Sequence, residues 1–200
     1  MRIVDVTSEN FEEAAAVLGA AFSDYAVFTF VLPPETADRE RKLLALMRYY
    51  AWWRFVRSWP LLAVEEDGRL LAVIAANPPH DGTPPPGEAE AERELVAVIG
   101  EEAEQRRRAY ESASGGGFPE VPKFFVGMIG VRPEARGRGL GKALMTEILH
   151  RSRAHPESRG IALCTESRDN LPFYRALGFD VVDHADGPIE SWSLWRYNDG

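Results

Sequence analysis

The sequence predicts an α/β protein, and two observations carry that expectation. Between residues 124 and 177 a strand, a helix, a second strand and a short helix follow one another, an order typical of crossover connections. Earlier in the chain, Asp67-Gly68 lies between two apolar runs, which indicates a β-hairpin. We therefore expect one domain over residues 1–200, because neither end of the chain has a complete set of strands.

The N-terminal third predicts one short strand and two helices. Ile3, Val4 and Val6 are β-branched and predict a short strand, and Ser8 or Asn10 can cap a helix that begins near Phe11. Pro33-Pro34 breaks the chain. A second helix is expected over about 38–58, where apolar residues recur at helical spacing.

The middle of the chain predicts the hairpin, a loop and a charged helix. The hairpin strands are expected at 61–64 and 70–75. Residues 77–87 contain five prolines and two glycines and are expected to be loop. Residues 88–112 have the pattern of a single charged helix, and the glycines at 115–117 follow as a connector.

The C-terminal half has the most regular pattern. Its expected elements are strand 124–131, helix 139–153, strand 161–165, helix 171–177, and a final strand pair at 179–182 and 191–197.

Composition narrows the class of function. With 23 Lys and Arg against 31 Asp and Glu, the net charge is −8, which argues against a general nucleic-acid partner. The single cysteine, Cys164, excludes an intramolecular disulfide and fits a cytoplasmic setting. No apolar run approaches the ~20 residues of a membrane span. We therefore expect no membrane partner. The four histidines show no metal-ligand spacing, so we also expect no bound metal.

The segment from Val131 to Ala143 is the most informative. It follows a strand, opens a helix and carries three glycines, so its main-chain amides could approach an anion. Six Lys or Arg and two Asp or Glu lie between Arg132 and Arg153, a local excess of positive charge. Arg136 and Ala143 do not fit a Walker loop, and Lys142 does not fit a dinucleotide fingerprint.

Two motifs carry a resemblance to a known family. Arg136-x-x-Gly139-x-Gly141 resembles the pyrophosphate-binding motif of the GNAT acetyltransferase superfamily, and the run from Asn170 to Phe179 resembles that family's second cofactor segment. The match covers a cofactor-binding core of about 123–182. The Phe22-x-Asp24-Tyr25 segment is similar to puromycin N-acetyltransferase-like members.

The resemblance implies a GNAT-like fold, with a mixed, centrally splayed sheet and helices on both faces. It also implies that acetyl-CoA lies in the splayed gap, with its pyrophosphate on main-chain amides and its pantetheine beside the strand that ends at Val131. The cofactor-binding residues it implies are Ile129, Gly130, Val131, Arg136, Gly137, Arg138, Gly139, Leu140, Gly141, Lys142 and Asn170.

The resemblance also implies that Tyr174 is catalytic, as the donor to the departing CoA sulfur. A phenol has a pKa of about 10 and a thiol about 8.5, so full proton transfer to the thiolate is uphill. Tyr174 therefore stabilises the thiolate as a hydrogen-bond donor as much as it protonates it.

The sequence does not identify a general base. The strand before the glycine segment contains no carboxylate, although many family members place one there. Glu166, Glu190, Asp81 and His80 stay open as candidates, together with a water chain. The aromatic residues at 49–55 could line an acceptor pocket or belong to a helix core.

The resulting hypothesis is an acetyl-CoA-dependent N-acetyltransferase that moves an acetyl group directly to a primary amine of a small molecule. A homodimer stays open as its assembly. Three alternatives stay open: a non-catalytic acyl-CoA-binding module of the same fold, an acetyltransferase acting on a protein amine, and an unrelated phosphate-ligand enzyme.

Overall fold

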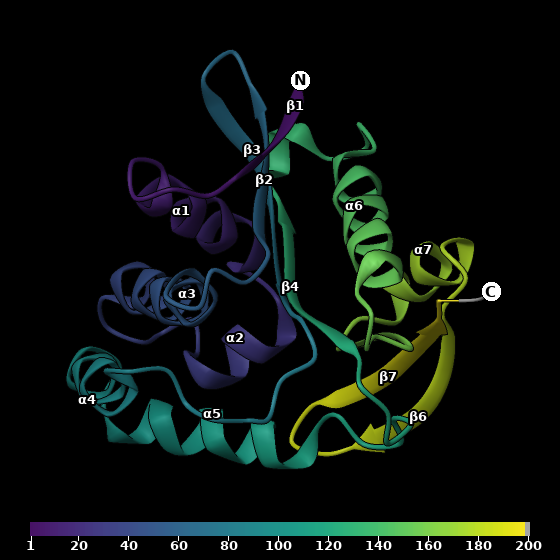
Figure 1. Ribbon diagram of the computed structural model, residues 1–200. Coiled ribbons are helices and arrows are strands. Elements are labelled where there is room, and N and C mark those ends of the chain that lie inside the picture. The colour runs from purple at the N-terminus through teal and green to yellow at the C-terminus, as the bar shows by residue number, and fades with distance from the viewer. Residues whose placement is uncertain (199–200) are drawn as a thin grey trace.

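A single mixed β-sheet forms the centre of the protein, seen nearly edge-on in Figure 1. The computed structural model describes residues 1–198. The seven strands lie in the order β1-β2-β3-β4-β5-β7-β6, and only β4 and β5 pair in parallel. The strands are β1 (Arg2–Asp5), β2 (Leu61–Glu66), β3 (Arg69–Asn77), β4 (Phe124–Val131), β5 (Gly160–Thr165), β6 (Asp180–Asp186) and β7 (Glu190–Tyr197).

The hairpin of β2 and β3 turns where the sequence predicts. Asp67 and Gly68 both have positive φ, 50° and 76°, the conformation that a two-residue hairpin turn of this hand requires. β3 is buried along nearly its whole length, which places the hairpin inside the sheet. The expected Asp-Gly hairpin is confirmed.

The sheet opens between β4 and β5. These strands pair only between Phe124–Val126 and Ile161–Leu163. Farther along, β4 continues to pair with β3 on its other side. The main-chain groups of residues 127–131 that face away from β3 therefore have no strand beside them. The expected mixed, centrally splayed sheet is confirmed.

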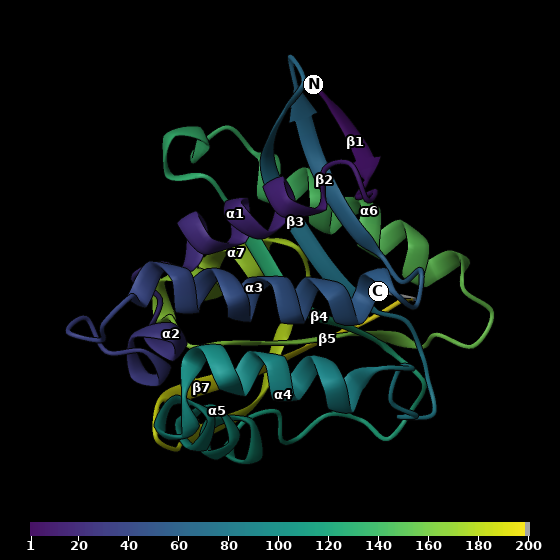
Figure 2. The same cartoon turned by 90° about the vertical axis from the view of Figure 1, so that its left-hand side faces the viewer.

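Helices cover both faces of the sheet (Figures 1 and 2). Two buried hydrophobic clusters result, one on each face. One face carries α1 (Phe11–Phe22), α2 (Ala26–Val31), α3 (Arg39–Phe55), α4 (Glu88–Ile99) and α5 (Glu101–Ala113), and the other carries α6 (Leu140–Ala154) and α7 (Leu171–Ala176).

One expectation about the helices is wrong, and one helix was not expected. The single helix predicted over 88–112 is two helices, α4 and α5, because Gly100 adopts a φ of 89° and interrupts the helical backbone. α2 was not predicted at all. Its six residues, Ala26–Val31, are too few for a periodic pattern to be recognised.

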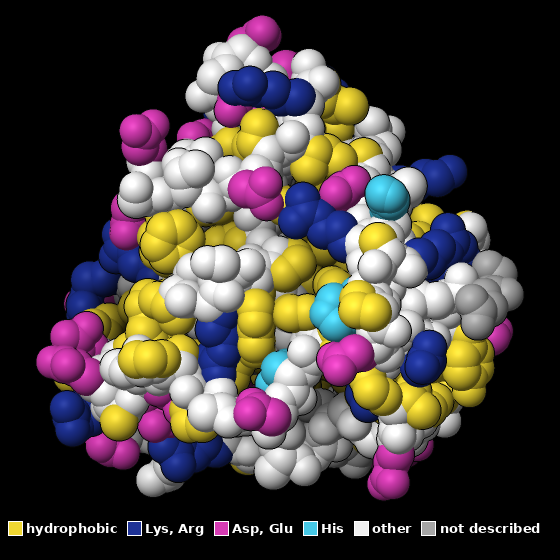
Figure 3. Space-filling view, in the orientation of Figure 1, with side chains coloured by type: hydrophobic (Ala, Val, Ile, Leu, Met, Phe, Trp, Pro, Cys, Tyr) yellow, Lys and Arg dark blue, Asp and Glu magenta, His cyan; other side chains and the backbone are white. Residues whose placement is uncertain are grey.

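Acidic and basic side chains are mixed around the left-hand margin of the face shown in Figure 3, and hydrophobic side chains gather toward its middle. Among the described residues, no helix is both long enough and apolar enough to cross a bilayer.

Candidate active site

A cleft of about 630 Å³ lies where β4 and β5 separate. Its walls come from the end of α1, the open edge of β4, the segment after β5 and α7. Because β4 faces the cleft with main-chain groups that no other strand pairs, an extended ligand could bind there as an added strand.

The structure gathers most of the predicted cofactor residues around this cleft. Six of the predicted residues line it directly, namely Ile129, Gly130, Val131, Arg136, Asn170 and Tyr174. Six others form the adjoining turn and the first turn of α6 and do not line the cleft itself, namely Gly137, Arg138, Gly139, Leu140, Gly141 and Lys142.

The turn before α6 has the backbone that an anion site needs. Gly137 and Gly139 have φ of 76° and 78°, which places successive amides in a tight turn. The first N–H groups of the 15-residue helix α6 have no preceding helical carbonyl to bind. Leu140 is buried beneath the turn and anchors it to the core. This end of α6 can therefore bind a phosphate through main-chain amides.

The two arginines of the turn have different partners. Arg136 lines the cleft and donates through Nη2 to the Ala21 carbonyl at the end of α1, 3.3 Å away. Arg138 instead forms two hydrogen bonds with Glu66, at 2.7 and 2.9 Å. Only the Arg136 side chain is thus positioned to add charge to the cleft.

Tyr174 lies in the wall of the cleft and is almost fully buried. Its ring packs between Phe173 and Phe179. Within residues 1–198 its hydroxyl has no hydrogen-bond partner, so it can donate to a ligand. Burial, and secondarily the charge of Glu166, raises the pKa of Tyr174 above its usual value. The phenol therefore keeps its proton, which favours donating a hydrogen bond over releasing the proton.

A second cavity of about 300 Å³ adjoins the cleft. It lies between α2, α3, α5 and the middle of β4, and it shares Phe22, Tyr25 and Val126–Met128 with the cleft. A molecule in this cavity would meet a second molecule that lies along β4. The two spaces therefore have the arrangement of a donor site and an acceptor site.

Glu166 lies where the cleft and the cavity meet, since it lines both. It follows β5 and is half-buried. Its Oε1 accepts hydrogen bonds from Tyr110 Oη at 2.7 Å and from Ser191 Oγ at 3.0 Å. These two donors fix the carboxylate, and its other oxygen receives no hydrogen bond from the described part of the chain.

Tyr25 connects the two sides of the site. Its hydroxyl accepts a hydrogen bond from the Glu166 amide at 2.9 Å and lies 3.1 Å from Thr165 Oγ1. Asn170 Nδ2 donates to the same Thr165 oxygen at 2.9 Å. Burial, more than the neighbouring Glu166 charge, raises the pKa of Tyr25, so its hydroxyl stays protonated.

The other candidate bases lie elsewhere. His80 and Asp81 line a separate hollow beside the proline-rich loop. Glu190 is exposed and is hydrogen-bonded to His184 at 2.9 Å. Of the four carboxylate and histidine candidates, Glu166 alone lines both the cleft and the cavity.

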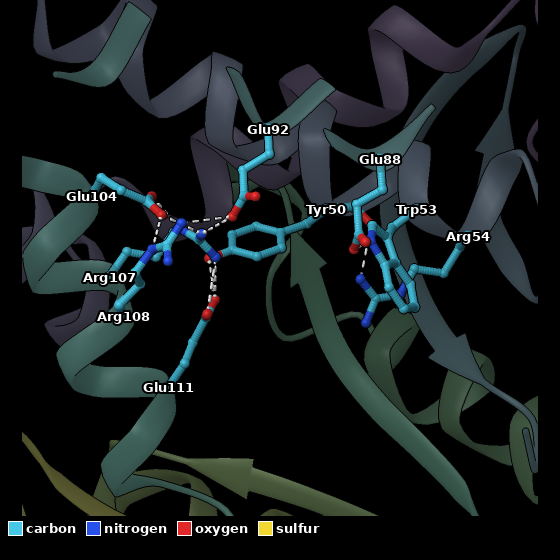
Figure 4. A network of polar contacts seen from close by, with 9 residues as sticks. All are labelled: Tyr50, Trp53, Arg54, Glu88, Glu92, Glu104, Arg107, Arg108 and Glu111. Carbon is cyan, nitrogen blue, oxygen red and sulfur yellow. Dashed lines mark hydrogen bonds and ion pairs between the residues drawn. The ribbon is translucent and has the colours of Figure 1, made fainter. Parts of the chain in front are cut away.

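A network of ion pairs fixes the outer wall of the cavity (Figure 4). Arg107 on α5 is buried and binds both oxygens of Glu104, each at 2.7 Å. The same guanidinium binds Glu111, which also accepts a hydrogen bond from the Tyr50 hydroxyl. Both Glu111 oxygens are thus engaged with Arg107, and Glu111 lines the cavity but not the cleft.

One group of possible metal ligands occurs among the described residues. Side-chain atoms of His184, Asp186 and Glu190 lie within 4.8 Å of one another. All three are exposed on the β6–β7 hairpin, and none lines the cleft or the cavity.

Sequence reasoning missed several residues of the site. Tyr110 lies on a helix whose charged pattern gives no sign of a buried hydroxyl. Arg54 lies within the aromatic run 49–55 and was not singled out as a site residue. Of the aromatic residues in that run, Tyr50 lines the cavity, whereas Trp52 and Phe55 do not. An arginine on the apolar face of a helix is the signal that could have identified it.

Several solved acetyltransferase structures have the same fold as this chain. The chain matches a histone acetyltransferase HPA2 and related acetyltransferase from Corynebacterium glutamicum with a TM-score of 0.71 and 20% identity, over 97% of this chain and 94% of that one. For the polyamine N-acetyltransferase of Drosophila melanogaster the values are 0.56 and 18%, over 97% of each chain. A GNAT family acetyltransferase from Brucella melitensis, in complex with acetyl-CoA, matches with a TM-score of 0.51 and 19% identity, over 95% of this chain and 85% of that one.

Residues 25–179 match the family model described as the acetyltransferase (GNAT) family. This match spans most of the chain, including most residues of the cleft, the turn before α6 and Tyr174. The chain therefore belongs to the GNAT acetyltransferase family. It is an N-acetyltransferase that depends on acetyl-CoA.

Proposed function

We propose that the protein transfers an acetyl group directly from acetyl-CoA to a primary amine of a small molecule, without a metal. The observation that carries this proposal is the pair of adjoining spaces, one along the open edge of β4 and one between α2, α3 and α5, with Glu166 lining both. The cavity, at about 300 Å³, has the size of a small-ligand site. The resemblance to puromycin N-acetyltransferase-like members stays a prediction.

Each predicted cofactor residue has a part in the proposal. Main-chain groups of Ile129, Gly130 and Val131 would pair with the pantetheine arm. Amides of the turn and of the first turn of α6, from Gly137 to Lys142, would bind the diphosphate. Arg136 would add charge to that site, and Asn170 would hydrogen-bond the cofactor arm.

The chemistry requires the amine to lose its proton before it can attack. An alkyl ammonium has a pKa near 10, so Glu166 would accept one proton and pass it to solvent. The nitrogen then forms a bond to the acetyl carbon, and the C–S bond breaks with its electron pair on the sulfur. Tyr174 donates a hydrogen bond to that sulfur, which finally takes the second proton from the nitrogen.

Thiol release from acetyl-CoA tests this function. A panel of small-molecule primary amines is expected to contain acceptors that release one CoA thiol per N-acetyl product. Acetylation of peptides alone would contradict the small-molecule assignment. Acetyl-CoA binding without thiol release for any amine or peptide would instead support a non-catalytic module.

Substitution of Arg136 tests the diphosphate site. We expect Arg136→Ala to weaken acetyl-CoA binding about 10-fold in isothermal titration, because an exposed charge-assisted hydrogen bond is lost. Arg138→Ala is the matched control, since the proposal uses only the Arg138 main-chain amide and its side chain binds Glu66. Equal losses for both variants would show a general charge effect and contradict the assigned contact.

A further inference from the structure

Arg54 is a buried cation that lacks an acidic partner. It lies in the last turn of α3 and is 8% exposed. Its Nη1 donates to the Tyr50 carbonyl at 2.9 Å, and its buried Nε has no hydrogen-bond partner. No carboxylate among residues 1–198 forms an ion pair with it. Because an unpaired buried charge is destabilising, the arrangement points to an anion that is supplied from outside the chain.

Arg54 also lines a neighbouring hollow with three acids, Glu88, Glu92 and Glu111, and each of them already binds another side chain. Glu88 accepts a hydrogen bond from the Trp53 indole at 2.8 Å. Glu111 binds Arg107, and Glu92 binds Arg107 and Arg108 (Figure 4). Burial lowers the pKa of Arg54 to about 10, so the guanidinium still carries its charge at neutral pH.

The Arg54 guanidinium belongs to the acceptor cavity and not to the cofactor cleft. Arg54 lines the cavity and is not among the residues that line the cleft. It lies over Gly127, at the bulge in β4 where the register with β3 shifts. A Cβ atom at position 127 would be 2.5 Å from Arg54 Nη2, so glycine leaves the space that the guanidinium occupies.

Six aromatic side chains line the cavity. Its rings could enclose a compact apolar body, and Glu166 lies at the border with the cofactor cleft. The aromatic residues are Phe22, Tyr25, Phe28, Tyr50, Tyr110 and Phe125. The cavity thus combines one unpaired cation, an aromatic wall and one carboxylate positioned toward the donor.

We propose that the acceptor is an amine that also carries a carboxylate, joined through a compact apolar or aromatic body. The Arg54 guanidinium, which lines the cavity, binds the carboxylate by a charge-assisted hydrogen bond. The amine lies beside Glu166, where it meets the acetyl group. A single arginine matches a monoanion such as a carboxylate, and no lysine lines the cavity. This inference rests on the proposed acetyl transfer.

Matched acceptor pairs test the inference. Phenylalanine and phenethylamine differ only by a carboxylate, as do 4-(aminomethyl)benzoate and benzylamine, and the two pairs differ in the spacing of amine and carboxylate. In at least one pair we expect kcat/KM for thiol release to be higher for the carboxylate by about 10- to 100-fold, the range of a charge-assisted hydrogen bond.

The ratio of kcat/KM between the carboxylate and its partner should fall toward one in the Arg54→Gln variant, whereas Arg54→Lys should retain part of it. Arg48→Gln is the control on the same helix, since Arg48 is exposed and pairs with Glu12. Thermal unfolding and titration with acetyl-CoA report whether each variant is folded. If Arg54→Gln does not fold, the ratios of the wild type and of Arg54→Lys still decide the matter.

Two outcomes would overturn the inference. One is a wild-type ratio near one in both pairs. The other is a loss in Arg54→Gln that is equal for both members of each pair, which would place Arg54 in a step common to all acceptors. If no amine releases thiol, the proposed function itself fails. Titration of N-acetylphenylalanine against N-acetylphenethylamine then tests the anion site, and equal affinities would overturn it.

Discussion

Replacing Tyr174 with phenylalanine is expected to lower kcat by about 10²–10⁴-fold, the contribution typical of a positioned proton donor. The hydroxyl lines the cleft and has no partner within residues 1–198, so its removal takes away the donor to the leaving sulfur. The ring would keep its packing against Phe173 and Phe179. Stopped-flow thiol release and titration with acetyl-CoA together measure the effect, which should fall on kcat and not on binding.

Tyr197→Phe is the matched control, because Tyr197 is 57% exposed and lines neither the cleft nor the cavity. Turnover of the Tyr174 variant within twofold of the wild type would remove Tyr174 from the mechanism. A weaker affinity for acetyl-CoA with unchanged kcat would make it a binding residue instead.

For Glu166→Gln we expect a fall in kcat of at least about 10²-fold at neutral pH, because an amide cannot accept the proton of the ammonium. Glutamine keeps an oxygen for the hydrogen bonds from Tyr110 and Ser191, so the local structure should survive. The loss should shrink as the pH approaches 10, where an alkyl amine is deprotonated without help. A pH–rate profile of the variant and the wild type makes the comparison.

Glu190→Gln tests the specificity of that result, since Glu190 is exposed on the β6–β7 hairpin and should leave turnover unchanged. A deficit in the Glu166 variant that stays constant up to pH 10 would argue against a role as base. It would assign Glu166 to positioning Tyr110 or the loop after β5.

The sequence predicted the backbone around the proposed cofactor site, because that backbone depends on local structure. The turn before α6 follows from adjacent glycines, and its helix begins within one residue of the expected position. The β2–β3 hairpin likewise follows from Asp67 and Gly68. In each case a few neighbouring residues determine the backbone.

The acceptor half could not be predicted in the same way, because it depends on contacts between distant segments. Tyr110 and Glu166 are 56 positions apart and meet only after α5 packs beside β5 and β7. The break at Gly100 separates α4 from α5, and a periodic pattern across it does not show the break. The position of the Arg54 guanidinium depends on the space left by Gly127, which lies on a strand far along the chain. The sequence around Arg54 does not show that space.

We expect the open edge of β4 and the turn before α6 to bind acetyl-CoA together. A crystal structure of the protein with CoA would show whether they do. We predict the pantetheine amides paired with Ile129–Val131, and the diphosphate oxygens about 3 Å from main-chain amides between Gly137 and Lys142. CoA bound at another surface, or a diphosphate that contacts only side chains away from this turn, would show that the cleft is not the cofactor site.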